Sequence, residues 1–169
     1  MKALCFGINA YDHLDDLLNC ERDAAAVADR IKNLPGCNPS SARVCLGSQL
    51  KDKKAMEDEV RKFVAEIDKD APPRVVVVSY SGHGIQDGAS ILMVPSGASK
   101  EPDELKRQGF SHNELFKILH DEIHKHTAVR APLSCPEQGD SECIRSTVMR
   151  TDSDPIIICW CARRDAWST

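Results

Sequence analysis

The sequence predicts an α/β fold of three layers, in which helices cover both faces of a mainly parallel β-sheet. The strongest evidence is a run of four valines at residues 75–78, which is typical of a strand buried on both faces. Other apolar runs alternate along the chain with segments of helical period, as in proteins built from parallel strands and crossover helices. The length of 169 residues fits one core, so we expect a single domain over residues 1–169.

Strands and helices alternate in the amino-terminal half. Apolar runs predict strands at residues 3–8, 42–46 and 74–80, and residues 9–19 are expected to form a loop. Two amphipathic helices separate the strands, because apolar residues recur there at spacings of about three to four residues. The first helix has its apolar face at Ala24, Val27, Ala28 and Ile31, and the second at Met56, Val60, Phe63, Val64 and Ile67.

The carboxyl-terminal half contains two further strands and one helix. Residues 90–94 predict a short strand, and Ser111 begins a helix because Ser111 and Glu114 have the spacing of a capping box. Residues 127–154 are rich in Ser, Thr, Asp, Pro and Gly, and we expect them to form a surface insertion. The last predicted strand covers residues 156–160.

Composition argues against several classes of function. The net charge of −4 gives no basis for binding nucleic acid or an anionic membrane surface. No apolar run approaches the length of about 18 residues that a membrane-spanning helix needs. The first residues lack the apolar stretch and cleavage site of a secretion signal, so we expect a cytoplasmic protein. Most thiols should be free in that reducing compartment.

The potential metal ligands lack an ordered pattern. No two cysteines have the Cys-x2-Cys spacing typical of zinc sites. His120 and His124 are four residues apart on a predicted helix, but the glutamate that directly follows the first histidine in zinc proteases is absent. We therefore expect no metal and no cofactor. The eight cysteines are Cys5, Cys20, Cys37, Cys45, Cys135, Cys143, Cys159 and Cys161.

His83 and Cys161 are the residues most suited to catalysis. His83 follows the valine strand, and Cys161 follows the last strand. Ligands of open parallel sheets bind beyond the carboxyl ends of the strands. If the two strands are neighbours, both side chains face one crevice, where an imidazole can take the proton of an attacking thiol. Gly82 and Gly84 are expected to let the backbone bend sharply around His83, and the Gly84 amide to point at a developing oxyanion.

Six stretches of the chain carry a resemblance to a known family. They are residues 3–11 (ALCFGINAY), 18–24 (LNCERDA), 80–84 (YSGHG), 92–95 (LMVP), 111–119 and 156–163. In this order they resemble the caspase-like cysteine peptidases, and most closely the metacaspases and related caspase-domain proteins. The resemblance covers most of the chain outside residues 127–154. It is most specific where the histidine motif is combined with the amino-terminal segment.

The resemblance implies a catalytic dyad and an oxyanion site. His83 would act as general base or proton shuttle and Cys161 as nucleophile. The amides of Gly84 and Cys161 would hold the oxyanion. The implied function is that of a cysteine-type endopeptidase that acts on a protein or peptide substrate.

The resemblance also implies a specificity pocket, which differs from that of metacaspases. Cys20, Asp23 and Ser81 match positions that line the pocket, where carboxylates accept Arg or Lys through charge-assisted hydrogen bonds. Metacaspases have a second carboxylate two residues before the nucleophile, where this chain has Cys159. We expect cleavage after Arg or Lys in preference to Asp, because Asp23 repels an acidic side chain. With one carboxylate instead of two, the basic residue should bind less well.

Two other departures concern the carboxyl-terminal part and calcium. The chain ends eight residues beyond Cys161, whereas the family fold continues with a small subunit. We expect the small-subunit strands to be lacking, the strand at residues 156–160 to form an exposed edge, and a small subunit or homodimer to complete the sheet. Asp87 is the only carboxylate between Gly84 and Lys100, which gives no support for the calcium site of metacaspases.

Each candidate also has a simpler structural explanation. Cys161 can be an inert buried thiol, His83 a turn residue, and Asp23 a carboxylate that stabilises the first turn of a helix. An oxidised Cys159–Cys161 pair would suit a thiol redox protein, although that pair would be strained and the spacing differs from thioredoxin-type motifs. The alternative function is a catalytically inactive caspase-homology module that acts as a regulatory or protein-binding domain.

Overall fold

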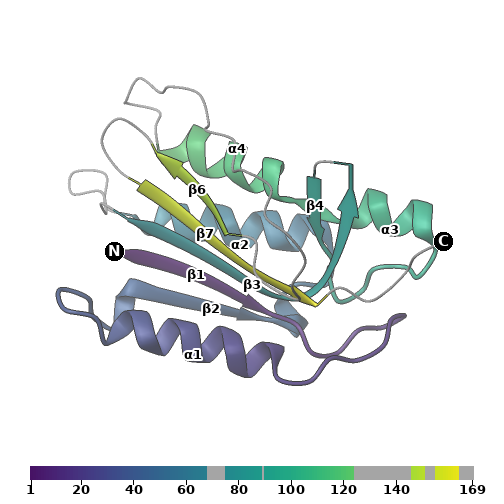
Figure 1. Ribbon diagram of the computed structural model, residues 1–169, viewed down its shortest axis with the longest axis horizontal. Helices are drawn as coiled ribbons and strands as arrows, with labels where there is room; N and C mark the ends of the chain where they lie inside the picture. The colour runs from purple at the N-terminus through teal and green to yellow at the C-terminus, as the bar shows by residue number, and fades with distance from the viewer. Residues whose placement is uncertain (68–74, 89, 124–145, 151–154, 164–169) are drawn as a thin grey trace.

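The structure is a computed structural model that describes residues 1–67, 75–88, 90–123, 146–150 and 155–163 (Figure 1). The strands are β1 (Lys2–Gly7), β2 (Ala42–Leu46), β3 (Val76–Asp87), β4 (Ser90–Met93), β5 (Phe110–Ser111), β6 (Ser146–Arg150) and β7 (Pro155–Arg163). The α-helices are α1 (Cys20–Lys32), α2 (Lys53–Ala65), α3 (Pro102–Gln108) and α4 (His112–Ile123).

Four parallel strands form the centre of the fold in the order β2-β1-β3-β7. Strand β3 lies in the middle, and its first half pairs with β1 on one side and β7 on the other. Beyond this parallel region β3 continues and pairs antiparallel with β4, which in turn pairs with β5. Strand β6 pairs antiparallel with β7. The prediction of an α/β fold with a mainly parallel sheet is confirmed.

Helices cover both faces of the sheet, as Figure 1 shows. Successive residues of β3 enter two separate cores, which confirms that the valine strand is buried on both faces. Val76 and Val78 belong to the larger core, formed with α2 and α4. Val77 belongs to the smaller core, which α1 covers. The smaller core consists of Ala3, Cys5, Ala24, Ala28, Ile31 and Val77.

Helix α1 packs unusually closely on the end of β1. A Cβ atom added to Gly7 would lie 2.7 Å from the Cα of Glu21 and 2.9 Å from the Cβ of Ala24, closer than such atoms normally approach. A larger residue at position 7 would therefore push the helix away from the sheet. This contact holds the amino terminus of α1 over the carboxyl end of β1.

The predicted capping box at the start of α4 is present. The Ser111 hydroxyl accepts a hydrogen bond from the Glu114 amide at 3.1 Å, and the Glu114 carboxylate accepts one from the Ser111 amide at 2.9 Å. Helix α3 and the two-residue strand β5, which lie between β4 and α4, were not predicted. None of the helices in the described ranges has the length and apolar character needed to cross a membrane.

The structure differs from the predictions for the carboxyl-terminal part at two places. Residues 146–150, which lie within the expected surface insertion, form strand β6, which was not predicted. The prediction that the strand at residues 156–160 is an exposed edge is wrong, because β6 pairs with the side of β7 that faces away from β3. That pairing satisfies backbone groups that an edge strand would leave exposed. Residues 127–145 and 151–154 lie outside the described residues.

A buried carboxylate joins α2 to β2. The Glu59 side chain is 8% exposed and accepts hydrogen bonds from Arg43 at 2.7 Å and Lys62 at 2.7 Å. The Cys45 thiol donates to the same carboxylate at 3.4 Å. Burial alone would raise the pKa of Glu59, but the hydrogen bonds from Lys62, Cys45 and Arg43 outweigh it and lower the pKa. Glu59 is therefore charged in the folded protein and holds the helix to the strand.

Replacing Glu59 by glutamine should lower the free energy of unfolding by about 1–3 kcal/mol at neutral pH, because charge-assisted hydrogen bonds are lost. The folded-state pKa of Glu59 lies below the unfolded value of about 4.3. Its stabilisation is thus present above that unfolded value and disappears as pH falls through the folded-state pKa. Urea unfolding of both proteins at about pH 7 and about pH 3 measures the difference.

The control is Glu57→Gln, which removes a carboxylate from the same helix at a partly exposed position. This variant should change stability much less at either pH. A deficit for Glu59→Gln that is equally large at acid and neutral pH would contradict the assignment of a charged, hydrogen-bonded Glu59.

Candidate active site

His83 lies inside β3 at the point where two kinds of pairing meet. The parallel pairing with β1 ends at Ser81, and the antiparallel pairing with β4 begins at Gly84. The prediction that His83 follows the strand in a sharp glycine bend is wrong, because β3 runs through it as an extended strand. Gly36 and Gly88 are the glycines with positive φ in the described residues, and Gly82 is not among them.

Gly82 is needed for space and not for a turn. A Cβ atom at this position would lie 2.5 Å from the hydroxyl oxygen of Tyr80 and 2.7 Å from that of Tyr11. Both tyrosines are buried, so their hydroxyls have little room to move away. The glycine before His83 therefore allows two hydroxyl groups to approach the strand.

The imidazole of His83 is held by a backbone carbonyl. The ring is buried, and its Nε2 atom lies 2.7 Å from the carbonyl oxygen of Asp15. A carbonyl can only accept a hydrogen bond, so this contact assigns the proton of the neutral ring to Nε2. Nδ1 then carries the lone pair, which makes it the atom suited to accept a proton.

Main-chain hydrogen bonds hold the loop of residues 9–19, which carries Asp15. The Leu17 amide donates to the Asn9 carbonyl at 2.7 Å and the Asp12 amide to the Ser96 carbonyl at 2.8 Å. The Tyr11 amide also donates to the Asp16 carboxylate at 2.9 Å. The loop is thus fixed to itself and to the segment after β4, which keeps the Asp15 carbonyl in place.

Cys161 lies in the strand next to His83. Strand β7 pairs with β3 in parallel, with Cys161 opposite Ser81 and Arg163 opposite His83. The two strands are therefore neighbours, which was the condition for His83 and Cys161 to share one crevice. The sequence predicted that Cys161 follows the end of this strand. In the structure Cys161 lies inside β7, which continues to Arg163. The roles of His83 and Cys161 remain predictions.

The pairing of β3 with β4 is compatible with a role of the Gly84 amide as an oxyanion donor. The Val94 amide donates to the His83 carbonyl at 3.1 Å, so Gly84 and Met93 form a pair of the non-hydrogen-bonded kind. In such a pair the Gly84 amide does not donate to Met93. Its role as an oxyanion donor, with the Cys161 amide, stays a prediction.

Two of the three predicted pocket residues are neighbours of Gly7. Ser81 pairs with Gly7 across the sheet, and a Cβ at Gly7 would lie 2.8 Å from the Cys20 carbonyl oxygen. Cys20 and Ser81 are both buried. Asp23 is exposed in the first turn of α1, where its amide donates to the Asn19 carbonyl at 2.7 Å. This position suits both a pocket carboxylate and one that merely stabilises the helix terminus.

Two other cysteines are unsuited to act as nucleophiles. Burial raises the pKa of the Cys5 thiol to about 11. Burial, with a further contribution from the Glu59 carboxylate, raises the pKa of Cys45 to about 12. Both therefore stay protonated at neutral pH, whereas the thiolate is the reactive form. Predictions for Cys135, Cys143 and the side chain of Cys159 fall outside what the structure describes.

The described residues contain no cluster of three or more His, Cys, Asp or Glu side chains that could hold a metal ion. His120 is exposed, and its Nδ1 atom lies 3.3 Å from the Asp121 carboxylate. Its predicted neighbour His124 is outside the described residues. Asp87 is exposed and forms an ion pair with Lys106 at 3.5 Å. These positions therefore suggest no metal ligand set among the described residues.

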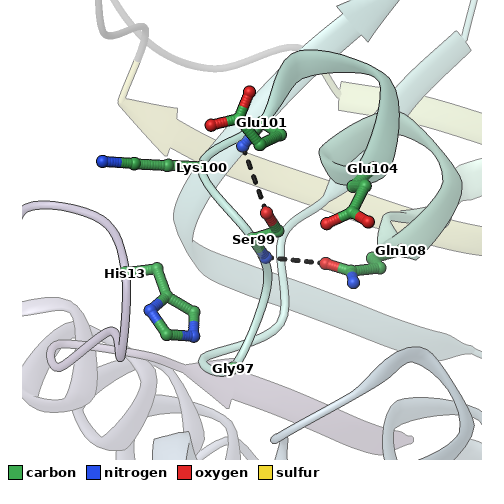
Figure 2. Close-up of a pocket in the computed structure, with 7 residues that line it drawn as sticks. All are labelled: His13, Gly97, Ser99, Lys100, Glu101, Glu104 and Gln108. Atoms are coloured by element: carbon green, nitrogen blue, oxygen red, sulfur yellow. Dashed lines mark hydrogen bonds between the residues drawn. The ribbon is translucent and has the colours of Figure 1, made fainter.

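A cavity of about 460 Å³ opens beside the loop of residues 9–19 (Figure 2). His13 contributes from that loop, and the other lining residues come from the segment between residues 97 and 108. Within the wall, the Ser99 amide donates to the Gln108 side chain at 2.7 Å. The lining holds neither a cysteine nor His83, so we assign no catalytic step to this cavity.

Asp15 and Tyr11 both contact His83, although no pattern in the sequence predicts a role for either residue. Asp15 acts through its backbone carbonyl, which every residue has, so the residue type carries no signal. Tyr11 lies in a loop that the apolar pattern left undefined. The one signal in the sequence was that Tyr11 falls within residues 3–11, a stretch that resembles the family.

The fold and the site together define a class of protein. It is a three-layer α/β protein with a buried histidine in the central strand and a cysteine in the adjacent parallel strand. The Caspase domain model of the Peptidase C14 family matches residues 1–131, and the chain belongs to this family. At the family level it is a caspase-like peptidase domain. The match includes His83 but ends before Cys161. None of the curated proteins compared with the chain matches it.

The neutral His83 ring should carry its proton on Nε2, because the Asp15 carbonyl accepts a hydrogen bond from that atom. Long-range ¹H–¹⁵N correlation spectra of the imidazoles, recorded at mildly alkaline pH, distinguish the two tautomers. The exposed His13 serves as an internal reference in the same spectrum. A His83 ring protonated mainly on Nδ1 would contradict the assignment.

Proposed function

We propose that the protein is a cysteine-type endopeptidase, with Cys161 as nucleophile and His83 as general base. The observation that carries the proposal is the parallel pairing of β3 with β7, with Cys161 opposite Ser81. Residues opposite each other lie on the same face of a sheet, and so do residues two apart in one strand. Residues 161 and 83 therefore fall on one face of two adjacent strands. The contact between His83 Nε2 and Asp15 supports the choice of Nδ1 as the basic atom.

The proposed reaction begins when the thiol proton of Cys161 moves to Nδ1 of His83. The sulfur attacks the carbonyl carbon of the scissile bond, and the amides of Gly84 and Cys161 stabilise the oxyanion that forms. His83 returns the proton to the leaving amine, the C–N bond breaks, and an acyl-enzyme remains. Water, deprotonated by His83, then hydrolyses the thioester and restores the thiol.

The proposed specificity is for Arg or Lys before the scissile bond. Asp23 supplies the carboxylate, and Cys20 and Ser81 line the pocket beside it. Support comes from the packing of the amino terminus of α1 against Gly7, which brings Cys20 and Ser81 to the same end of the sheet. Because Cys159 replaces a second carboxylate, we expect discrimination to be modest. Charge still favours a basic over an acidic residue.

A small subunit or a second copy of the chain is the proposed partner that completes the sheet. Among the described residues β6 pairs with β7 alone, so the other side of β6 is the place where a further strand would add. An added strand would bind the backbone groups of β6 through main-chain hydrogen bonds.

Fluorogenic peptides that end in Arg, Lys or Asp test the proposed activity. We expect the purified protein to cleave the Arg and Lys peptides faster than the Asp peptide. Cys161→Ala and His83→Ala should each reduce cleavage by at least about 100-fold, because the nucleophile or the base is removed. Cys5→Ala is the matched control, since the Cys5 thiol stays protonated, and should leave cleavage intact.

Cleavage that persists in Cys161→Ala would contradict Cys161 as the nucleophile. The replacement of a pocket carboxylate by Cys159 favours a second candidate function, that of an inactive caspase-homology module. A folded protein that cleaves none of the peptides would support this second candidate and would refute the peptidase proposal.

A further inference from the structure

Two tyrosine hydroxyls bind the backbone of His83. The His83 amide donates to the Tyr11 hydroxyl at 2.9 Å, and the Tyr80 hydroxyl lies 2.7 Å from the His83 carbonyl oxygen. The two hydroxyl oxygens are 3.5 Å apart. Both tyrosines are buried, with 7% and 1% of their surface exposed. The amide and the carbonyl of His83 are thus bound by one pair of side chains.

The direction of these hydrogen bonds follows from the groups involved. An amide only donates and a carbonyl only accepts, so Tyr80 gives its proton to His83. The Val94 carbonyl is a more distant acceptor for this proton, at 3.1 Å. Tyr11 accepts from the His83 amide and can direct its own proton to the Tyr80 oxygen. The three residues therefore form a closed ring of hydrogen bonds that starts and ends at His83.

Tyr80 keeps its proton over the pH range in which a thiol would react. Burial, followed by the neighbouring Tyr11, raises the pKa of Tyr80 well above its usual value. A tyrosine that stays neutral is a constant donor to the His83 carbonyl. The hydrogen-bond ring is therefore not expected to change when the dyad titrates.

Tyr11 also contacts the His83 side chain. The two rings meet edge to face, with centroids 4.5 Å apart and planes at 61°. Asp15, four residues further along the same loop, binds Nε2 of that imidazole. The loop of residues 9–19 thus contacts the ring at two places, and Tyr11 adds the bond to the backbone amide. These contacts together restrict both rotation and displacement of the imidazole.

We infer that Tyr11 is a positioning residue for His83, a role that rests on the proposed peptidase function. It acts through His83, whose imidazole it holds in place for proton transfer with Cys161. The hydroxyl group is the part that matters, because a phenylalanine would fill the same space but could not accept the bond from the His83 amide.

Tyr11→Phe separates positioning from simple packing. We expect kcat for the Arg peptide to fall by about 10- to 100-fold, with a KM change below about threefold, because the base is misplaced while the substrate pocket is intact. The variant should also show faster hydrogen exchange at the His83 amide and a smaller fraction of the Nε2-protonated tautomer. Phe63→Leu, a substitution in the core on α2, is the control for a general loss of stability.

The two readouts keep this inference separate from the proposed function. If the unmodified protein cleaves no peptide, the peptidase proposal fails, and the exchange and tautomer measurements still decide the role of Tyr11. Unchanged His83 exchange and tautomer in Tyr11→Phe would overturn the inference. The inference would also be overturned if Phe63→Leu, with the same loss of stability as Tyr11→Phe, lowered kcat by the same factor.

Discussion

The pairing of β3 with its two parallel neighbours is the constraint on which the candidate site depends. Strand β1 aligns the start of β3, and β7 runs beside it as far as His83. Because β7 is parallel to β3, Cys161 and His83 occur at the same end of the sheet although 78 residues separate them in the sequence. Burial of alternate valines in two cores stabilises this central strand on both faces. A shift of one residue in the β3–β7 register would move Cys161 to the other face.

His83 is held mainly by groups that do not take part in the proposed reaction. The Asp15 carbonyl selects the ring tautomer, and two buried tyrosine hydroxyls bind the amide and the carbonyl of His83. Gly82 is necessary for this arrangement because any side chain there would collide with both hydroxyls. Such preorganisation is valuable in proton transfer, since small displacements of a base reduce rates strongly. Cys5 and Cys45, in contrast, are buried thiols whose raised pKa makes them unreactive.

Much of the fold could be predicted from the sequence, because its strongest signals are local. The valine run, the apolar stripes of α1 and α2, and the capping box of Ser111 and Glu114 each reflect burial or hydrogen bonding that a short segment determines. The strand β6 was missed because Ser146–Arg150 lies within a polar stretch, and its strand state depends on pairing with distant β7. The function of Gly82 could not be predicted from the sequence, since glycine serves both in turns and at close contacts, and only the tyrosine positions distinguish the two.

The parts of the candidate site that could be predicted are those in which the side chain itself would react. A histidine and a cysteine that each follow a buried apolar run were sufficient to nominate the dyad, and the family match covers the histidine. The contribution of Asp15 was not predictable, because it is made by a backbone carbonyl that any residue could provide. The contact between Tyr11 and His83 depends on the three-dimensional path of the loop of residues 9–19. It could not be predicted, because this loop has no periodic pattern of apolar residues.

The most direct test of the account is whether the reactivity of Cys161 depends on His83. The rate of iodoacetamide alkylation at Cys161, followed by peptide mass spectrometry across pH, measures this in the unmodified protein and in His83→Ala. We expect Cys161 to react rapidly near neutral pH, and His83→Ala to shift its pH profile toward that of an ordinary thiol, which ionises near pH 8.5. Identical profiles in the two proteins would show that the residues are not coupled and would contradict the proposed dyad.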